Sequence, residues 1–310
     1  VLYREQRAAS RYHTKKLKEQ VGVKVSSMMV TKRDGTKEPV SLDKITNRVS
    51  VLSTGLSIDP IIVAQKAIPG LYNDITSTEI DNYLSETAAA LTVEHPDYSY
   101  LAARIKSNAL HKETPGFVIA TKNLFEDGLL KEDYYKKVIE NADIIESIID
   151  YDRDYSFDYF ALTTLIRAYL LKFNNKTIER PQDLWMRVAL TVSCNNFDIA
   201  KIKKTYDTIS TGLYTHATPT LFNSGLKMQQ LSSCFLIGME DDSIDGIFNT
   251  IKDCALISKT AGGIGMHAHN IRAGGSRIKS TNGKSNGLIP FLKIFNETAK
   301  SVDQGGGKRK

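Results

Sequence analysis

Cys234 is the residue whose neighbours most invite a chemical interpretation. It lies in MQQLSSCFLIG, residues 228–238, between two serines and an apolar run that predicts a buried β-strand. The preceding ATPTLFNSG, residues 217–225, offers hydroxyl and amide groups able to bind phosphate oxygens, although alone it is typical of a turn. A free cysteine is by default a small buried hydrophobic residue, so packing and chemistry both stay open for Cys234. Cys194 and Cys254 offer no better redox case.

A second group of residues that could bind a ligand is basic. Lys32, Arg33 and Lys37 surround a glycine turn, and Lys44 opens the helix expected next, whose N-terminal amides attract anions. Phosphate binding is one interpretation, but taken alone the pattern fits a charged turn facing solvent better. The glycine cluster AGGIG, residues 261–265, likewise fits the end of a helix better than a phosphate-binding loop.

Three histidines suggest a metal site that their spacing does not support. No cysteine or carboxylate completes a site around His216, His267 or His269 at ligand spacing. Alternate histidines on a strand would share only one face. We therefore expect no metal site.

The bulk properties exclude several classes of protein. The 310 residues are enough for two domains, and 41 Lys+Arg against 35 Asp+Glu give a net charge of +6, which favours an anionic ligand. DNA binding is not expected, because no long basic stripe with interleaved aromatic residues is present. No apolar run approaches the ~20 residues of a membrane span. Three cysteines without framework spacing favour a reducing compartment, so we expect a cytoplasmic protein.

The elements that must position these residues begin with a compact N-terminal unit. Short strands on either side of an Asp-Gly turn predict a β-hairpin over 28–40. A helix ending at Gly55 follows, and the capping-box spacing of Thr76 and Glu79 starts another. A further helix is expected over 97–112. One hairpin and several helices make a plausible small domain.

The rest of the chain changes its pattern near residue 230. Helical periodicity dominates from Tyr134 to Tyr214, most strongly over 158–172 and 181–192. Beyond 230 the order becomes strand, helix, strand, helix, which is typical of βαβ units and a parallel sheet. A parallel sheet of only two strands leaves its edges open, so we expect a fragment of a longer fold or a chain that needs a partner.

Together these segments closely resemble one family, the large catalytic subunit of class I ribonucleotide reductase of the eukaryotic and viral type. The likeness runs from Met28 to Arg309 and corresponds to the N-terminal portion of such a subunit. Its most specific strings are KRDG, HPDYSYLAARI, YDRDYSF, THATPTLFN, QLSSCFL, DDSIDGI, ALISKTAGGIG and TNGKSNGL.

The resemblance implies an α/β protein with a mostly helical N-terminal part. An ATP-cone would be followed by a helical region and by the first strands of a ten-stranded α/β barrel, which stays incomplete. We therefore expect a flexible basic leader at 1–27, the ATP-cone regulatory domain at 28–119, the helical region at 120–229 and the truncated barrel domain at 230–310.

The resemblance also assigns nucleotide sites. The activity site of the cone, where ATP activates and dATP inhibits, would contain Lys32, Arg33, Glu38, Asp43, Lys44, Ser77 and Asp81. The substrate diphosphate and ribose would be faced by Thr218 and Ser233. The specificity site, which reads a deoxynucleotide or ATP, would contain Asp242, Ser243, Ile244, Lys259 and Arg272, and the loop linking effector to substrate would contain Gln304 and Arg309.

By the same match, Cys234 is one of two cysteines that deliver electrons to the ribose 2′ position and become a disulfide. Its partner would be neither Cys194 nor Cys254. The radical-bearing loop of the family, Asn-x-Cys-x-Glu, does not occur in these 310 residues, so we expect this chain alone to bind nucleotides without reducing them.

The implied effectors are ATP, dATP and other deoxynucleoside triphosphates, accompanied by Mg²⁺. The implied partners are a ribonucleoside diphosphate substrate, the small radical-generating subunit, a second large subunit, the missing C-terminal part of the catalytic chain, and thioredoxin or glutaredoxin.

Two other functions compete with this interpretation. The first is a nucleotide-binding regulatory or dimerisation module that takes no part in catalysis, whose function the change Cys234→Ser would leave intact. A cobalamin-dependent reductase can share the cone and the barrel, but the eukaryotic-type strings disfavour it.

Overall fold

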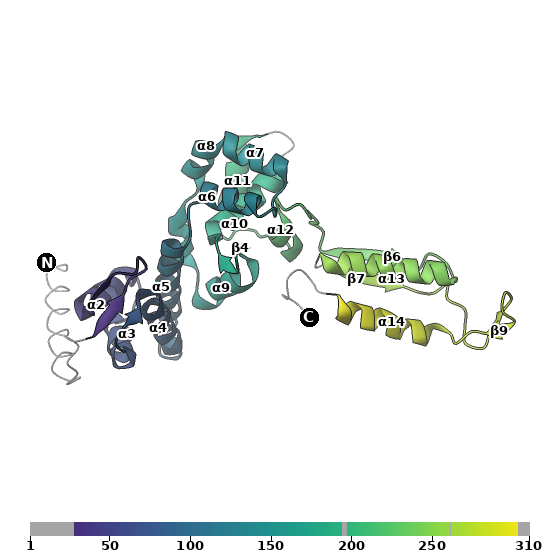
Figure 1. The fold of residues 1–310 in the computed structure, drawn as a ribbon, viewed down its shortest axis with the longest axis horizontal. Coiled ribbons are helices and arrows are strands. Elements are labelled where there is room, and N and C mark those ends of the chain that lie inside the picture. The colour runs from purple at the N-terminus through teal and green to yellow at the C-terminus, as the bar shows by residue number, and fades with distance from the viewer. Residues whose placement is uncertain (1–27, 194–196, 261, 303–310) are drawn as a thin grey trace. The chain divides into compact units, whose positions relative to one another are not determined.

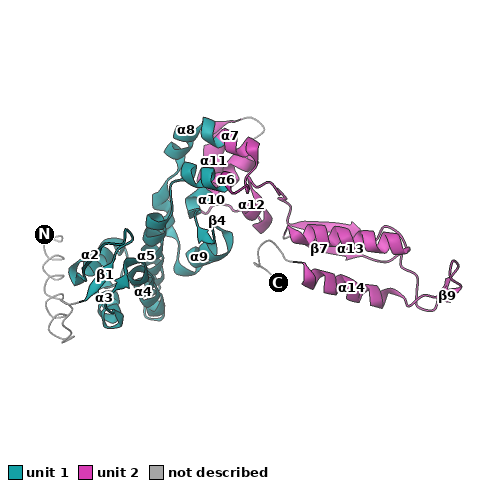
Figure 2. Cartoon of the chain, viewed as in Figure 1, with its two compact units in different colours: residues 1–124, 138–184 teal, residues 125–137, 185–310 magenta. Residues whose placement is uncertain are grey.

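The computed structural model describes residues 28–193, 197–260 and 262–302 (Figure 1). The chain divides into two compact units (Figure 2): residues up to 124 together with 138–184 form the first, and 125–137 together with those from 185 onward form the second. The predicted leader at 1–27 lies outside the described residues, as do Cys194, Gln304 and Arg309.

The first unit begins with a three-stranded sheet in the order β2-β1-β3. β1 (Met29–Thr31) pairs antiparallel with β2 (Lys37–Pro39) and parallel with β3 (Ile75–Thr76). Gly35 in the hairpin turn has φ 82°, a conformation that glycine adopts without strain. The predicted hairpin is therefore confirmed. β3 was not predicted, because a strand of two residues has no alternation to detect.

Four helices pack around this sheet: α2 (Leu42–Leu52), α3 (Pro60–Ala67), α4 (Ser77–Ala90) and α5 (Asp97–Glu113), with 3₁₀ turns at Ile68–Gly70 and Leu91–Val93. The predicted capping box starts α4, since Thr76 accepts from the Glu79 amide while the Glu79 carboxylate accepts from the Thr76 amide. Leu101 on α5 and Val63 on α3 are fully buried in the shared core. The predicted helices of this segment are confirmed.

The segment after α5 contains α6 (Phe117–Glu126), α8 (Ala142–Ile148), the 3₁₀ helix η4 (Tyr151–Ser156), α9 (Tyr159–Thr164) and the π-helical turn η5 (Leu165–Tyr169). The helix predicted over 158–172 is therefore too long. It gives way to a hairpin of β4 (Lys172–Phe173) and β5 (Lys176–Thr177). Asn174 and Asn175 have φ 49° and 63°, the left-handed pair that a two-residue hairpin turn requires.

The second unit holds most of α7 (Glu132–Glu140) and α10 (Pro181–Val192), together with α11 (Ile199–Ser210) and α12 (Thr218–Asn223). α10 begins at Pro181, as predicted. α12 corrects the expectation of a turn at 217–225, because Thr218 to Asn223 form a short helix with Pro219 in its first turn. Proline and threonine are tolerated at a helix start as well as in turns, so the composition did not distinguish the two.

The predicted βαβ unit is present in β6 (Cys234–Gly238), α13 (Ile244–Lys259) and β7 (Gly263–His267), with β6 and β7 parallel. β6 is not the buried strand that its apolar run predicted. Its residues alternate between exposed and half-buried, and the side chain of Leu236 is 94% exposed. The reason is that this sheet has two strands in the described chain, so α13 covers one face and the other face stays open.

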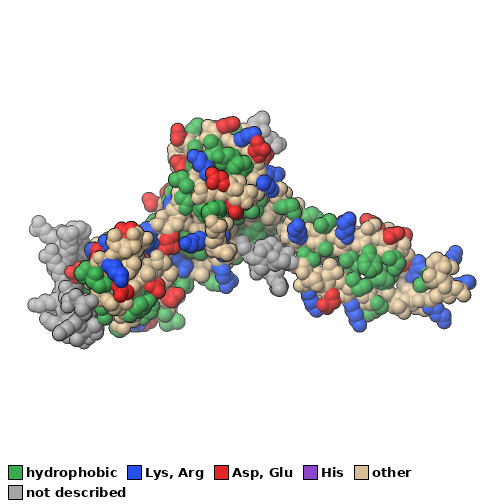
Figure 3. Space-filling view, in the orientation of Figure 1, with side chains coloured by type: hydrophobic (Ala, Val, Ile, Leu, Met, Phe, Trp, Pro, Cys, Tyr) green, Lys and Arg blue, Asp and Glu red, His purple; other side chains and the backbone are tan. Residues whose placement is uncertain are grey.

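The described chain ends with the hairpin of β8 (Arg277–Ile278) and β9 (Gly283–Lys284), followed by α14 (Leu288–Ser301). α14 packs on α13, as Figure 1 shows, and the helix predicted there is confirmed. Among the described helices, none is both long enough and apolar enough to cross a membrane. On the face drawn in Figure 3, basic and acidic side chains are interspersed.

Candidate functional site

A buried carboxylate organises the residues that the resemblance assigns to the activity site. Asp81 on α4 is 1% exposed and forms ion pairs with two arginines. Arg33, from the β1–β2 turn, lies 2.9 Å from Asp81 Oδ2, and Arg48, from α2, contacts Asp81 Oδ1. A buried carboxylate requires such partners, because burying an unpaired charge costs several kcal/mol. The turn is thereby fixed against two helices.

A second, exposed carboxylate gathers the lysines of the same region. Glu38 on β2 lies 2.7 Å from Lys32 Nζ and 2.9 Å from Lys44 Nζ. The hydrogen bond to Glu38 raises the pKa of Lys32, and the bond to Lys32 lowers the pKa of Glu38. Asp43 and Ser77 lie in the first turns of α2 and α4. The predicted set therefore surrounds the hairpin and the starts of two helices, where backbone amides favour anions.

The sequence did not identify Arg48, Lys112 or Glu113 as members of this cluster. Arg48 also donates to Asn108 on α5 at 2.8 Å, and Glu113 at the end of α5 accepts from Arg33 at 2.9 Å. The pKa of Lys112 is lowered, because partial burial and the nearby charges of Arg48 and Arg33 disfavour its protonated form. Arg48 lies three residues after the buried Ile45 and therefore shares its face of α2, and this spacing was the sign that its side chain turns toward the core.

Cys234 opens β6 and is exposed, with no disulfide. Its Sγ lies 3.7 Å from the hydroxyl of Ser233, and the strand residue opposite is Gly263. A Cβ at Gly263 would stand 3.6 Å from the sulfur, so glycine keeps this side of the thiol open. The other described cysteine, Cys254, is buried in α13, where loss of contact with water raises the pKa of its thiol.

The segment before β6 is tied to α12, which carries Thr218. Thr220 Oγ1 donates to the carbonyl of Leu231 at 2.9 Å, and Asn223 Nδ2 donates to the carbonyl of Gln230 at 2.7 Å. These bonds hold the middle and the end of α12 beside the chain that leads into Ser233 and Cys234. The hydroxyl-rich segment is therefore bonded to Gln230 and Leu231, three to four residues before the thiol.

The predicted specificity residues divide between the two ends of α13. Ser243 caps the N-terminus by accepting from the Gly246 amide at 3.0 Å. Arg272 donates to Asp242 through its side chain at 2.5 Å, and Ile244 is 66% exposed beside them. Lys259 lies in the last turn of the same helix, about 22 Å along the axis from Ile244. A single copy of the chain therefore brings Asp242, Ser243, Ile244 and Arg272 together and leaves Lys259 at the other end of the helix.

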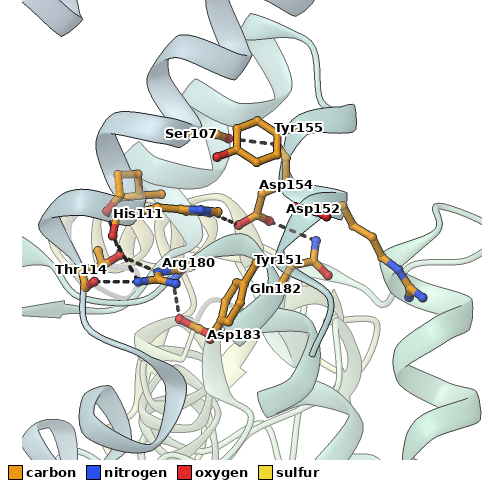
Figure 4. Close-up of polar contacts among 12 residues, drawn as sticks. Ser107, His111, Thr114, Tyr151, Asp152, Asp154, Tyr155, Arg180, Gln182 and Asp183 are labelled. Carbon is orange, nitrogen blue, oxygen red and sulfur yellow. Dashed lines mark hydrogen bonds and ion pairs between the residues drawn. The ribbon is translucent and has the colours of Figure 1, made fainter. Parts of the chain in front are cut away.

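A buried polar network lies at the end of α5 (Figure 4). Asp154 in η4 is fully buried and lies 2.7 Å from His111 Nε2 and 3.0 Å from Gln182 Nε2. Arg180 donates to the carbonyl of Thr114 and to its hydroxyl, both at 2.8 Å, and so satisfies groups at the C-terminus of α5. The network joins the end of α5 to the start of α10.

Asp183 completes this network, and its burial is expected to make the free energy of unfolding depend on pH. It accepts from the Arg180 amide and from the Tyr151 hydroxyl at 2.8 and 2.7 Å, yet complete burial raises its pKa to about 7. The folded protein therefore binds this proton more tightly than the unfolded chain does, and the free energy of unfolding falls as the pH rises from about 4 to 7.

The change Asp183→Asn tests this directly. Relative to the wild type, the variant should gain up to about 1.4 kcal/mol of stability for each pH unit between pH 5 and 7, measured by urea denaturation. Titratable groups that the two proteins share cancel in the difference. A difference independent of pH would contradict the assignment.

Three family models match the chain in sequence. The ATP cone domain matches residues 28–113, the all-alpha domain of ribonucleotide reductase matches 155–229, and the barrel domain of ribonucleotide reductase matches 232–310. The first contains the Asp81 cluster, the second contains Thr218, and the third contains Ser233 and Cys234.

Curated proteins give the same result. The chain is 50% identical over 296 residues to the ribonucleoside-diphosphate reductase large subunit of Arabidopsis thaliana, covering 91% of this chain and 36% of that protein. It is 50% identical to large chain 2 of Saccharomyces cerevisiae (91% and 34% covered) and 49% identical to the large subunit of variola virus (91% and 38%). The chain thus spans about a third of the length of these relatives. It belongs to the ribonucleotide reductase large-subunit family and carries the ATP cone, the all-alpha domain and the start of the barrel domain.

Proposed function

We propose that this chain is the N-terminal portion of a ribonucleoside-diphosphate reductase large subunit, which reduces ribonucleoside diphosphates to deoxyribonucleoside diphosphates by thiyl-radical chemistry. The observation that carries the proposal is the exposed thiol of Cys234 beside Ser233, next to the segment that holds Thr218. Cys234 would supply one of the two thiols that a two-electron reduction consumes, and the hydroxyls of Thr218 and Ser233 would bind the substrate.

The regulatory part of the proposal rests on the Asp81 cluster. ATP or dATP would bind at the hairpin and the starts of α2 and α4, where Lys32 and Lys44 offer charge to the phosphates and Ser77 offers a hydroxyl. Mg²⁺ would arrive with the phosphates. The cone would occupy 28–119, the helical region 120–229 and the barrel segment 230–310, and the working compartment would be the cytoplasm.

A second large subunit is part of the proposal for a geometric reason. Lys259 and Ile244 are held at opposite ends of one helix, so they can serve one specificity site only if Lys259 comes from another copy. The remaining partners would be the small radical-generating subunit, the C-terminal part of the catalytic chain, and thioredoxin or glutaredoxin. The loop containing Gln304 and Arg309 would connect effector identity to substrate choice.

Nucleotide titration tests the regulatory half of the proposal. Lys32→Ala should weaken dATP binding about tenfold, because one charge-assisted contact to phosphate is worth roughly 1.4 kcal/mol. Lys66→Ala is the matched control, since Lys66 is another exposed lysine paired with a carboxylate, Glu94, and lies outside the predicted site. Equal dATP affinity in both variants would remove Lys32 from the site.

A turnover assay tests what the 310 residues do alone. With the small radical-generating subunit, a thiol reductant and CDP, the purified chain should yield no dCDP, because no Asn-x-Cys-x-Glu loop is present. Formation of dCDP would overturn this expectation.

A further inference from the structure

A small cavity lies between α13, α14 and β7, and the proposed function does not use it. Its volume is about 170 Å³. The side chains that shape its chemistry are Cys254 and Ser258 from α13, Ile264 and Met266 from β7, and Phe295 and Thr298 from α14. Of the described residues that were predicted for the activity, substrate and specificity sites, none lines it. The cavity is therefore separate from the nucleotide sites assigned to this chain.

The cavity results from a change in side-chain size along the seam between the two helices. Ile247 and Ile251 of α13 fill the first half of the seam, and two phenylalanines of α14 pack against their cluster. Cys254 and Ser258 continue the same face of α13, at steps of three and four residues. On α14 the phenylalanines are followed by Thr298. Small side chains therefore line the second half of the seam and leave space there.

The walls favour an uncharged ligand. Among the described residues that line the cavity, none carries a charged side chain. Burial raises the pKa of the Cys254 thiol, so this group stays protonated at neutral pH. A charge moved into such surroundings would lose its contact with water and gain no partner of opposite sign, which is unfavourable.

One polar group in the wall has no partner within the described chain. Ser258 is 6% exposed, and its hydroxyl forms no hydrogen bond with another described residue. Thr298 differs in this respect, because its hydroxyl donates to the carbonyl of Ile294 at 2.9 Å, as hydroxyls within helices often do. A buried hydroxyl without a partner is unfavourable, so a ligand with one polar atom at this position would be stabilised.

The volume limits the size of the ligand. Sites for drug-sized molecules measure about 300 to 1,000 Å³, so a nucleotide does not fit, whereas an apolar cavity of about 150 Å³ can hold benzene. Water in the cavity would find few polar partners in its walls. Replacing such poorly held water with an apolar ring favours binding.

We propose that this cavity binds a compact uncharged molecule of about the size of phenol, with a single ring and one hydroxyl or carbonyl group. The ring would pack on Ile264, Met266 and Phe295, where sulfur and aromatic contacts are favourable. The polar group would form a hydrogen bond with the Ser258 hydroxyl. Because α14 has no buried residue in the described chain, the ligand would also stabilise the packing of α14 on α13. The proposal does not depend on the reductase assignment.

Calorimetric titration of the full 310-residue chain with phenol and with toluene tests the proposal, because the two molecules have similar size and differ in the hydroxyl. Phenol should bind with a Kd of about 1 mM or below. Ser258→Ala should weaken phenol binding about fivefold, through the loss of one neutral hydrogen bond, and should change toluene binding less than about twofold. Ser301→Ala is the matched control, since this exposed serine of α14 lies outside the cavity and its hydroxyl donates to the carbonyl of Glu297. It should leave both affinities unchanged.

Ser258→Leu tests the location of the site. The leucine side chain would occupy the space that the ligand needs, so phenol and toluene should both lose affinity at least about tenfold.

Protection of Cys254 tests the location without relying on the folding of the leucine variant. In a Cys194→Ser, Cys234→Ser background, Cys254 is the one thiol of the chain. Phenol at about ten times its Kd should slow the reaction of this thiol with methyl methanethiolsulfonate about tenfold, because the reagent then reaches only the small fraction of chains whose cavity is empty.

Three results would overturn the proposal: no binding of either molecule, unchanged affinities in the Ser258→Leu variant, or an unchanged rate of Cys254 modification in the presence of phenol. An equal loss of phenol and toluene affinity in the Ser258→Ala variant would contradict the hydrogen bond, and with it the class of ligand that we propose.

Discussion

Replacing Cys234 with serine is expected to abolish deoxyribonucleotide formation in an assembly completed by the rest of the catalytic chain and the radical-generating subunit. In the proposed reaction, a serine hydroxyl cannot become half of a disulfide, so the two electrons for the ribose 2′ position would have no source. We expect turnover of CDP with a thiol reductant to fall by about 10³ or more, which corresponds to about 4 kcal/mol of barrier.

Two controls make this result specific. Cys254→Ser changes a thiol that is buried in α13, and it should retain turnover. Binding of dATP should be the same in the Cys234→Ser variant and the wild type, because the thiol lies far along the chain from the cone. Full turnover by the Cys234→Ser variant would instead favour the competing interpretation, a regulatory module without catalysis.

The fold was predictable where local rules decide it. The Asp-Gly turn, the capping box at Thr76 and Glu79, and Pro181 at the start of α10 each fix a boundary through backbone chemistry within a few residues. The hairpin at 172–177 was not predicted, because the helical periodicity continues up to its first strand. The Asn174-Asn175 pair was the one local sign of a turn.

Burial was less predictable than secondary structure. The apolar run of β6 predicts a strand covered on both faces, as in a parallel sheet with helices on either side. The described chain supplies α13 for one face and leaves Leu236 almost fully exposed. The apolar run shows that the strand is suited to burial on both faces. Whether it is buried depends on other segments of the chain that pack against it, and a local sequence pattern does not identify those segments.

The candidate sites show the same division. The lysines of the hairpin stand close together in the sequence, so the sequence alone pointed to them as a possible phosphate site. The arginine that completes the Asp81 cluster lies 33 residues before its partner, and Lys112 lies 31 residues after it. No spacing rule links positions so far apart; only the packing of α2, α4 and α5 brings them together.

The largest effect on stability is expected at Asp81. Its carboxylate is 1% exposed and balances both Arg33 and Arg48, whose side chains are about a quarter exposed. Asp81→Asn keeps the shape but leaves the partly buried guanidinium group of Arg48 without a counter-charge, and leaves Arg33 with Glu113 as its one remaining carboxylate partner among the described residues. Removing one partner of a buried pair costs about 3 to 5 kcal/mol, and partial solvation of the arginines reduces this to about 2 to 4 kcal/mol. Urea denaturation at pH 7 measures it.

The matched control is Asp74→Asn, which breaks the exposed pair between Asp74 and Lys37. Asp74 is 46% exposed and has φ 64°, a conformation that asparagine also tolerates, so the loss should stay below about 1 kcal/mol. Adding Arg48→Met to Asp81→Asn should recover part of the lost stability, because the guanidinium charge that lost its counter-charge is then removed as well. If the double variant is as unstable as the sum of the single changes, the two side chains act independently, and the carboxylate does not hold the hairpin and α2 together through charge.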